Sequence, residues 1–131
     1  FLTVGAAAPL QKAALAGLEL PLSYYDQLQS QYESKRALFL SGLDELGFRY
    51  YRPQGAYYVM VDISEYGITN DESFCYWLAR DIGVGAVPGS SFFREPVHNY
   101  IRLHFAKKEE TLMEALKRLK NLRELPEVYA I

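Results

Sequence analysis

The chain has 131 residues, of which 50% are hydrophobic and 15% aromatic, and its formal net charge is −2 at pH 7. A chain of this length buries roughly two thirds of the surface of its unfolded state, so it can form one hydrophobic core, and its apolar content excludes the disordered and low-complexity classes. The slightly acidic balance excludes a general nucleic-acid binder, which needs an excess of Lys and Arg to neutralise phosphates.

A single cysteine, Cys75, cannot form an internal disulfide, which fits a reducing compartment, so the cytoplasm is the expected location. No uninterrupted apolar run approaches the length needed to cross a bilayer, and we expect no membrane partner. The sequence begins with Phe1 and continues with an apolar, Ala- and Gly-rich segment that would make a poor exposed terminus. We therefore expect the chain to be part of a longer protein.

The first predicted elements are two helices. A short helix begins at Pro9, because proline at the first helical position loses no hydrogen bond, and Gly17 and Pro21 interrupt it. A long amphipathic helix follows over residues 22–46, with its apolar side chains spaced by three, four and seven positions. These side chains are Tyr25, Leu28, Tyr32, Phe39, Leu43 and Leu46. Because this helix is longer than one small domain needs, we expect its N-terminal half to link two domains.

Two strands and a short helix are predicted next. The segments RYYR and AYYVMVDI predict a hairpin with a tight reversal at Pro53-Gln54-Gly55. Thr69 and Glu72 have the spacing of a capping box that starts a helix, and Gly83 ends that helix. Its inner stripe consists of Phe74, Trp77, Leu78 and Ile82, with Cys75 packed nearby.

The rest of the chain predicts a short strand and a glycine-rich loop in VGAVPGSSFF, a further strand, and a final helix. The inward side of that helix consists of Leu112, Ala115, Leu116, Leu119 and Leu122. The order of elements predicts an α+β fold of two layers, in which a short, mostly antiparallel sheet packs against helices.

The segment NYIRLHFA, residues 99–106, alternates between apolar and polar residues as a half-buried strand does. The apolar residues on the side that seeks the core are Ile101, Leu103 and Phe105. The other side carries Arg102, flanked by Tyr100 and His104. Taken alone, this arginine is more often an ordinary surface charge than a functional cation.

The glycine-rich segment Gly83–Gly89 does not match a nucleotide-binding loop. Its glycines have the wrong spacing, and it follows a helix, whereas a dinucleotide fingerprint follows a strand. We interpret Gly83 as a helix cap and Pro88-Gly89 as a turn. In a functional version, that turn presents its backbone and Phe92 to a cleft.

The other groups with reactive side chains indicate packing or solvation. His98 and His104 are the only histidines and have no ligand beside them at a metal-binding spacing, so no metal site is predicted. Ser90 and Ser91 lack the sequence of a nucleophile elbow, and no nucleophile is assigned. Lys12 lies in an Ala-rich helical segment and is interpreted as a solvated lysine, not as a Schiff-base residue.

Five stretches in this order resemble the C-terminal small domain of the class I/II pyridoxal-phosphate-dependent aminotransferases of fold type I. They are PLQKAALAGL, the long helix, PQGAYYVMVDIS, GVGAVPGSSFF and NYIRLHFAKKEETLMEALKRL. Each is weak alone, but five in register cover nearly the whole chain. The resemblance implies that residues 1–21 are the tail end of the large domain, that 22–46 are a linking helix, and that 47–131 are the small domain.

In that family an arginine on the matching strand binds the α-carboxylate of the amino-acid substrate, and the matching residue here is Arg102. A guanidinium suits this role because its planar pair of N–H donors matches a carboxylate and stays charged. By the same resemblance, Gly89 and Phe92 lie at the mouth of the substrate cleft. The family's Schiff-base lysine and most cofactor ligands belong to the large domain. The resemblance thus implies no catalytic or cofactor-binding residue in this chain, which we expect to be inactive alone.

The resemblance therefore implies a fragment of a transferase of amino-acid metabolism, including biosynthetic processes, with pyridoxal 5'-phosphate as cofactor. Its substrates would be an amino acid and a 2-oxo acid, and the full-length form a cytoplasmic homodimer. The segment FAKKEETL resembles most the branch that handles kynurenine, methionine or related substrates, sometimes with β-lyase side activity. Aspartate-type enzymes share much of the same pattern, so the choice between these branches stays open.

Three alternatives stay open: a pyridoxal-phosphate-dependent C–S β-lyase, an aminotransferase-like effector-sensing domain of a transcriptional regulator, and a stand-alone α+β interaction domain. A winged-helix segment upstream of the large domain would favour the regulator.

Overall fold

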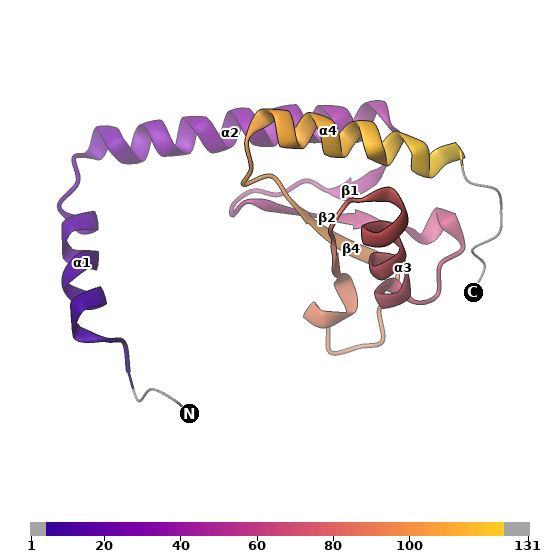
Figure 1. The fold of residues 1–131 in the computed structure, drawn as a ribbon, viewed down its shortest axis with the longest axis horizontal. Coiled ribbons are helices and arrows are strands. Elements are labelled where there is room, and N and C mark those ends of the chain that lie inside the picture. Colours follow the sequence, from indigo (N-terminus) through magenta and orange to yellow (C-terminus); the bar gives the residue numbers. More distant parts are fainter. Residues whose placement is uncertain (1–4, 125–131) are drawn as a thin grey trace. The chain divides into compact units, whose positions relative to one another are not determined.

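The fold is taken from a computed structural model that describes residues 5–124 (Figure 1). The chain divides into two compact units, residues 1–31 and 32–131. Among the described residues, no helix combines the length and the hydrophobicity that a membrane span requires.

The first unit contains helix α1, Ala8–Leu18, and the beginning of helix α2, Leu22–Glu45. A proline in the first turn starts α1, as predicted, because its missing N–H would have no partner there. The Tyr25 hydroxyl donates a hydrogen bond to the carbonyl of Gly17. No residue of α1 is buried, and large apolar side chains of this unit are exposed: Leu10, Leu15, Leu18, Leu22, Tyr24 and Tyr25.

The second unit is built on a four-stranded sheet of order β1-β2-β4-β3. The strands are β1 Arg49–Tyr51, β2 Tyr58–Asp62, β3 Val87–Pro88 and β4 Tyr100–His104, and every pairing is antiparallel. In the central pair Met60 lies opposite Arg102, and in the outer pair Val87 lies opposite the same arginine. Arg102 is thus in the central part of the sheet.

Helices follow the strands as the sequence predicts. Helix α3, Asp71–Trp77, continues into a π-helical turn, Leu78–Ile82, and Gly83 ends it with a φ of 75°. Helix α4, Glu109–Lys120, runs beside the second half of α2 in Figure 1 and leads into a 3-10 turn, Asn121–Glu124. Two further 3-10 turns are Ser64–Tyr66 and Gly89–Phe92.

One face of the sheet is buried under these helices, and its core is a single cluster. Alternate residues of β2 and β4 point into it, together with the inner stripes of α3 and α4, because the side-chain period of a strand is two and that of a helix is 3.6. Representative core residues are Val59, Val61, Ile101, Leu103, Phe74, Leu78, Leu112 and Leu119. The predicted two-layer α+β fold is confirmed, and the free cysteine, Cys75, is buried in the same cluster.

Three local predictions need correction. The cap of α3 is Asn70, whose side chain accepts a hydrogen bond from the backbone N–H of Ser73, and not Thr69. The link between β1 and β2 is longer than a tight reversal, because residues 52–57 lie outside both strands. In α2 only the later part of the predicted stripe is buried, and Tyr25 and Leu28 are exposed.

Candidate functional site

The candidate site lies on the face of the sheet opposite the core. Strand alternation places polar and aromatic side chains there, and they are exposed or half-buried, whereas their neighbours along each strand are buried. From β2 and β4 this face consists of Tyr58, Met60, Asp62, Tyr100, Arg102 and His104. We call it the open face.

Arg102 is half-buried on the open face because two aromatic rings contact its guanidinium. The guanidinium carbon lies 4.7 Å from the ring centre of Tyr58 and 4.0 Å from that of Phe92. Tyr58 belongs to the adjacent strand, whereas Phe92 comes from the 3-10 turn that follows β3. Rings over the face of a guanidinium hold it by cation–π attraction and leave its in-plane N–H groups free for a ligand.

Within residues 5–122, the Arg102 guanidinium has no carboxylate within ion-pair distance and donates no hydrogen bond. A half-buried cation without a carboxylate is uncommon, because burying a charge costs free energy unless another group pairs with it. The N–H donors of Arg102 are therefore available to an anion from outside the described chain.

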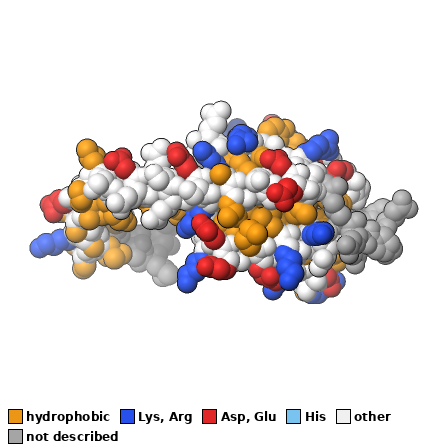
Figure 2. Space-filling view, turned by 90° about the horizontal axis from the view of Figure 1, so that it is seen from above, with side chains coloured by type: hydrophobic (Ala, Val, Ile, Leu, Met, Phe, Trp, Pro, Cys, Tyr) orange, Lys and Arg blue, Asp and Glu red, His pale blue; other side chains and the backbone are white. Residues whose placement is uncertain are grey.

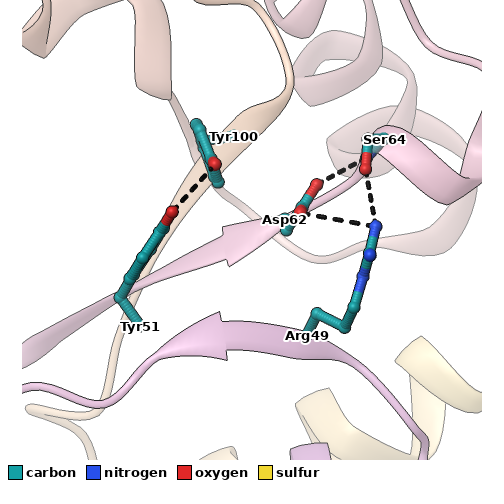
Figure 3. A network of polar contacts seen from close by, with 5 residues as sticks. All are labelled: Arg49, Tyr51, Asp62, Ser64 and Tyr100. Atoms are coloured by element: carbon teal, nitrogen blue, oxygen red, sulfur yellow. Dashed lines mark hydrogen bonds and ion pairs between the residues drawn. The ribbon is translucent and has the colours of Figure 1, made fainter.

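Arg49 on the same sheet provides the contrast (Figure 3). Its guanidinium lies 3.4 Å from Oδ2 of Asp62 and donates a 2.7 Å hydrogen bond to Oγ of Ser64. Burial would raise the pKa of the Asp62 carboxyl, but hydrogen bonds from Ser64 and the nearby Arg49 outweigh burial and lower it. Arg49 is thus engaged by a carboxylate of its own sheet, whereas Arg102 is not.

A pair of tyrosines, one from β1 and one from β4, lies on the open face (Figure 3). The hydroxyl oxygens of Tyr51 and Tyr100 lie 3.2 Å apart, and their ring centres are 5.7 Å apart. The hydrogen bond with Tyr100 raises the pKa of Tyr51, because it favours the protonated phenol. The Tyr51 hydroxyl therefore stays protonated, and it can donate or accept a hydrogen bond without repelling an anion.

The turn Gly89–Phe92 is held tightly against β4. β3 pairs with β4 directly before it, and Gly89 is buried in close contact with the strand. A Cβ atom at Gly89 would lie 2.6 Å from the carbonyl oxygen of Tyr100. Glycine is required there by this close approach, which brings Phe92 within reach of Arg102.

Asp71 also holds the turn Gly89–Phe92 in place. It is the first residue of α3, its side chain is fully buried, and its Oδ2 accepts a 2.7 Å hydrogen bond from the backbone N–H of Ser90. Its Oδ1 lies 3.1 Å from Nδ1 of His98. Burial would raise the pKa of Asp71, but the hydrogen bonds from Ser90 and His98 outweigh it and lower the pKa.

The structure thus brings together the three residues that the sequence singled out for this site. Arg102 and Phe92 are in contact, and Gly89 is at the start of the turn that carries Phe92. Sequence reasoning missed Tyr58, which it placed in a strand without assigning it to the site, and Asp71, which it did not consider. His98, interpreted as a core or surface histidine, is half-exposed and contacts Asp71.

One hollow lies away from the open face. A groove of about 400 Å³ between α2 and α4 is lined by Leu38, Leu46, Met113, Leu116 and several charged residues. Figure 2, which views the molecule from above, shows hydrophobic side chains gathered over the part that contains α4, with acidic and basic side chains around them. Among the residues that the structure describes, no group of three His, Cys, Asp or Glu side chains is arranged to hold a metal ion.

Comparison with known proteins identifies relatives over most of the chain. The family model described as aminotransferase class I and II matches residues 1–119. Methionine aminotransferase of Escherichia coli (strain K12) is 37% identical over 123 residues, which are 93% of this chain and 32% of that protein. Aspartate/prephenate aminotransferase of Thermus thermophilus is 35% identical over 105 residues, 80% of this chain and 26% of that protein.

A structural relative agrees. The structure of N-succinyldiaminopimelate aminotransferase from Mycobacterium tuberculosis superimposes with a TM-score of 0.81 at 29% identity, covering 92% of this chain and 32% of that one. The chain therefore spans about a third of the length of the methionine aminotransferase and of the N-succinyldiaminopimelate aminotransferase.

Proposed function

Because the chain belongs to the family of class I and II aminotransferases, we propose that it is the C-terminal part of a pyridoxal-phosphate-dependent enzyme that transfers an amino group between an amino acid and a 2-oxo acid. In this proposal Arg102 binds the α-carboxylate of both substrates. The small domain thus supplies the substrate anchor, and the reacting groups come from the remaining two thirds of the protein.

The single observation that supports this role is the guanidinium of Arg102, which is half-buried between two rings and free of any carboxylate of residues 5–122. An entering carboxylate forms charge-assisted hydrogen bonds with such a group without first displacing an existing partner. Arg49, which already pairs with Asp62, would have to give up that contact.

Two relatives that are named for different amino acids support the α-carboxylate as the ligand of Arg102. Methionine and aspartate differ in the polarity and charge of their side chains, so a site common to their enzymes recognises what the substrates share. The shared group is the α-carboxylate beside the amino group. A bidentate arginine recognises that group whatever side chain follows, and the proposal leaves side-chain selection to other residues.

The contribution of Arg102 to the reaction is orientation. The cofactor, when bound, supplies an electron sink for the bond that breaks at Cα. A planar guanidinium that grips both carboxylate oxygens fixes the rotation of the substrate about its Cα, and so selects which bond faces that sink. The two rings over the guanidinium keep its direction constant while the substrate binds and leaves.

The residues of this chain fit a substrate-binding part better than a cofactor-binding one. The open face contains no lysine, and the described lysines lie on helices or in the short segment before α4. They are Lys12, Lys35, Lys107, Lys108, Lys117 and Lys120. We propose that the Schiff-base lysine and the phosphate ligands are in the part of the protein upstream of this chain.

We extend the proposal to the organisation of the whole protein. Residues 1–21 would end the large domain, residues 22–46 would link the domains, and residues 47–131 would form the small domain. The exposed leucines of α1 support this division, because an apolar helix surface is usually covered by a neighbouring domain. A cytoplasmic homodimer is the proposed form of the full-length enzyme.

The test uses the full-length protein and the variant Arg102→Ala. Wild-type protein should absorb visible light through its cofactor, and amino acids should shift that band. Removing one member of a desolvated charge pair costs of order 2 to 5 kcal/mol, so kcat/KM for the amino acid should fall by roughly 30-fold or more. Arg102→Lys should restore only part of the loss, because an ammonium lacks the bidentate geometry.

Arg49→Ala is the matched control, since it removes an arginine of the same sheet that already has a carboxylate partner. Its kcat/KM should stay within about threefold of wild type. Unchanged turnover in Arg102→Ala would remove this residue from the site. A full-length protein with neither cofactor absorbance nor amino-group transfer would overturn the proposed activity itself.

A further inference from the structure

Asp71 is a fully buried carboxylate, and no other charged side chain is buried among the residues whose exposure is described. It lies on α3 and not on the strands that carry the open face. Neither the proposed carboxylate binding nor the proposed reaction uses it. A buried charge is costly to keep unless it performs a structural or functional task, so its contacts deserve an explanation.

The contacts of Asp71 close one segment of the chain at both ends. Its Oδ2 accepts a hydrogen bond from the backbone of Ser90, and its Oδ1 contacts the ring of His98. Between these two points the chain leaves the turn Gly89–Phe92 and approaches β4. One carboxylate therefore fixes where the segment 90–98 begins and where it ends.

Phe92 lies inside that closed segment, two positions after Ser90. Its ring is one of the two that hold the guanidinium of Arg102, at 4.0 Å. The other ring, Tyr58, comes from the adjacent strand and does not depend on the segment. Of the two rings that contact Arg102, only Phe92 therefore lies in the segment that Asp71 holds.

We propose that Asp71 is a positioning residue for substrate binding: its carboxylate closes the segment 90–98 at both ends, and so holds the ring of Phe92 against the guanidinium of Arg102. The inference rests on the proposed function for its effect on catalysis. The closure of the segment itself does not depend on that function, and a separate measurement tests it.

The protonation state of Asp71 is consistent with this role. Hydrogen bonds from Ser90 and His98 outweigh burial and lower the pKa of Asp71, so its carboxyl is ionised near neutral pH. An ionised carboxylate only accepts hydrogen bonds, and therefore Nδ1 of His98 carries the proton at this contact. Both partners of Asp71 are donors, which a neutral apolar side chain could not satisfy.

The first experiment compares Asp71→Ala and Asp71→Asn in the full-length enzyme with L-methionine as amino donor and 2-oxoglutarate as acceptor. Alanine leaves the N–H of Ser90 without its acceptor, and KM for L-methionine should rise roughly five- to tenfold with a smaller change in kcat. In Asp71→Asn, the side-chain oxygen still accepts the hydrogen bond from the backbone N–H of Ser90. The side-chain NH2 group donates to Nδ1 of His98 when the imidazole carries its proton on Nε2. KM for L-methionine should therefore stay within about twofold of wild type.

Two comparisons separate positioning from a general structural role. The amine 3-(methylthio)propylamine equals methionine without its carboxylate, and its turnover should be the same in wild type and Asp71→Ala. In an Arg102→Ala background, adding Asp71→Ala should change KM for methionine by less than about twofold, because residues that act through one another are not additive. If Asp71→Ala lowered the turnover of methionine and of the amine equally, the proposal would be overturned. The same holds if Asp71→Ala raised KM for methionine as much in the Arg102→Ala background as in wild type.

A second measurement tests the closure without any turnover. Arg94 is exposed inside the segment, and the rate of tryptic cleavage after it, followed by mass spectrometry, reports how often the segment opens. Cleavage should be faster in Asp71→Ala and unchanged in Asp71→Asn. Equal rates in wild type and Asp71→Ala would overturn the closure, even if the enzyme proves to have another activity.

If Asp71→Ala does not fold, His98→Ala replaces it, since the His98 ring is half-exposed and its removal breaks only one of the two contacts. That variant should show a smaller rise in KM and faster cleavage after Arg94. If Arg102→Ala alone leaves methionine turnover unchanged, the proposed function fails, and the cleavage rates still decide whether Asp71 closes the segment.

Discussion

The guanidinium carbon of Arg102 lies 4.0 Å from the ring centre of Phe92, although one residue belongs to β4 and the other to the turn that follows β3. Two separate constraints produce this contact. The pairing of β3 with β4 places the turn Gly89–Phe92 beside β4. Gly89 then allows the turn to approach the strand closely. An arginine whose direction is fixed in this way loses little further freedom when it binds an anion.

The first prediction concerns Phe92→Ala in the full-length protein. A cation–π contact contributes about 0.5 to 2 kcal/mol, so KM for the amino acid should rise roughly 2- to 30-fold. Phe93→Ala is the matched control: the two side chains are similarly exposed, at 47% and 43%, but Phe93 packs on Tyr100. Steady-state kinetics of both variants provide the measurement, and equal effects would contradict a specific role for Phe92.

Much of this site was predictable because burial of one face imposes a period on the sequence. The alternation in residues 99–106 located β4 and assigned Arg102 to the face opposite the core, as the structure has it. The spacing of apolar residues in α4 likewise predicted its buried side. Both features depend on local order along the chain, which a sequence displays directly.

Asp71 and Tyr58 were not predictable in the same way. An acidic residue in the first turn of a helix is typical of a solvated helix start, and nothing in the sequence indicates that this one is buried. It is buried because Ser90 and His98 return to it from 19 and 27 positions along the chain. Such contacts leave no period in the sequence. The cap of α3 was misplaced by one position because Thr and Asn are both favoured there.

The second prediction is that Gly89→Ala destabilises the chain. Its Cβ would lie 2.6 Å from the carbonyl oxygen of Tyr100 and 2.7 Å from the Cβ of the same residue, and a strand backbone cannot move aside without disturbing the sheet. The expected loss is about 1 to 3 kcal/mol in the free energy of unfolding. Urea unfolding measures it, with Gly85→Ala as control, because a Cβ at Gly85 would meet no atom within 4 Å. Equal stabilities of the two variants would disprove the close approach.

The third prediction is that the Cys75 thiol is unreactive in the folded chain. Burial raises its pKa from 9.0 to about 12, and only the thiolate is nucleophilic. Iodoacetamide at pH 8 should therefore alkylate Cys75 slowly in buffer and rapidly in denaturing urea, as followed by intact mass. Because the pKa is raised on folding, this thiol stabilises the fold below pH 9 and loses that contribution as the pH rises toward 12. Fast alkylation of folded protein would show that the thiol is accessible.

The last prediction concerns acid stability and the contacts of Asp62 in Figure 3. Its pKa is lowered on folding by Ser64 and Arg49, which outweigh burial, so the unfolded chain binds a proton first as the pH falls. The stabilising contribution of Asp62 is complete well above the unfolded value of 3.8 and is lost as the pH falls below it.

Asp62→Asn should therefore be less stable than wild type by about 0.5 to 1 kcal/mol at pH 6, and the difference should shrink below pH 4. Urea unfolding of both chains between pH 3 and pH 7 measures this difference. A difference that stays constant down to pH 3 would show that the carboxylate is not held by these contacts in solution.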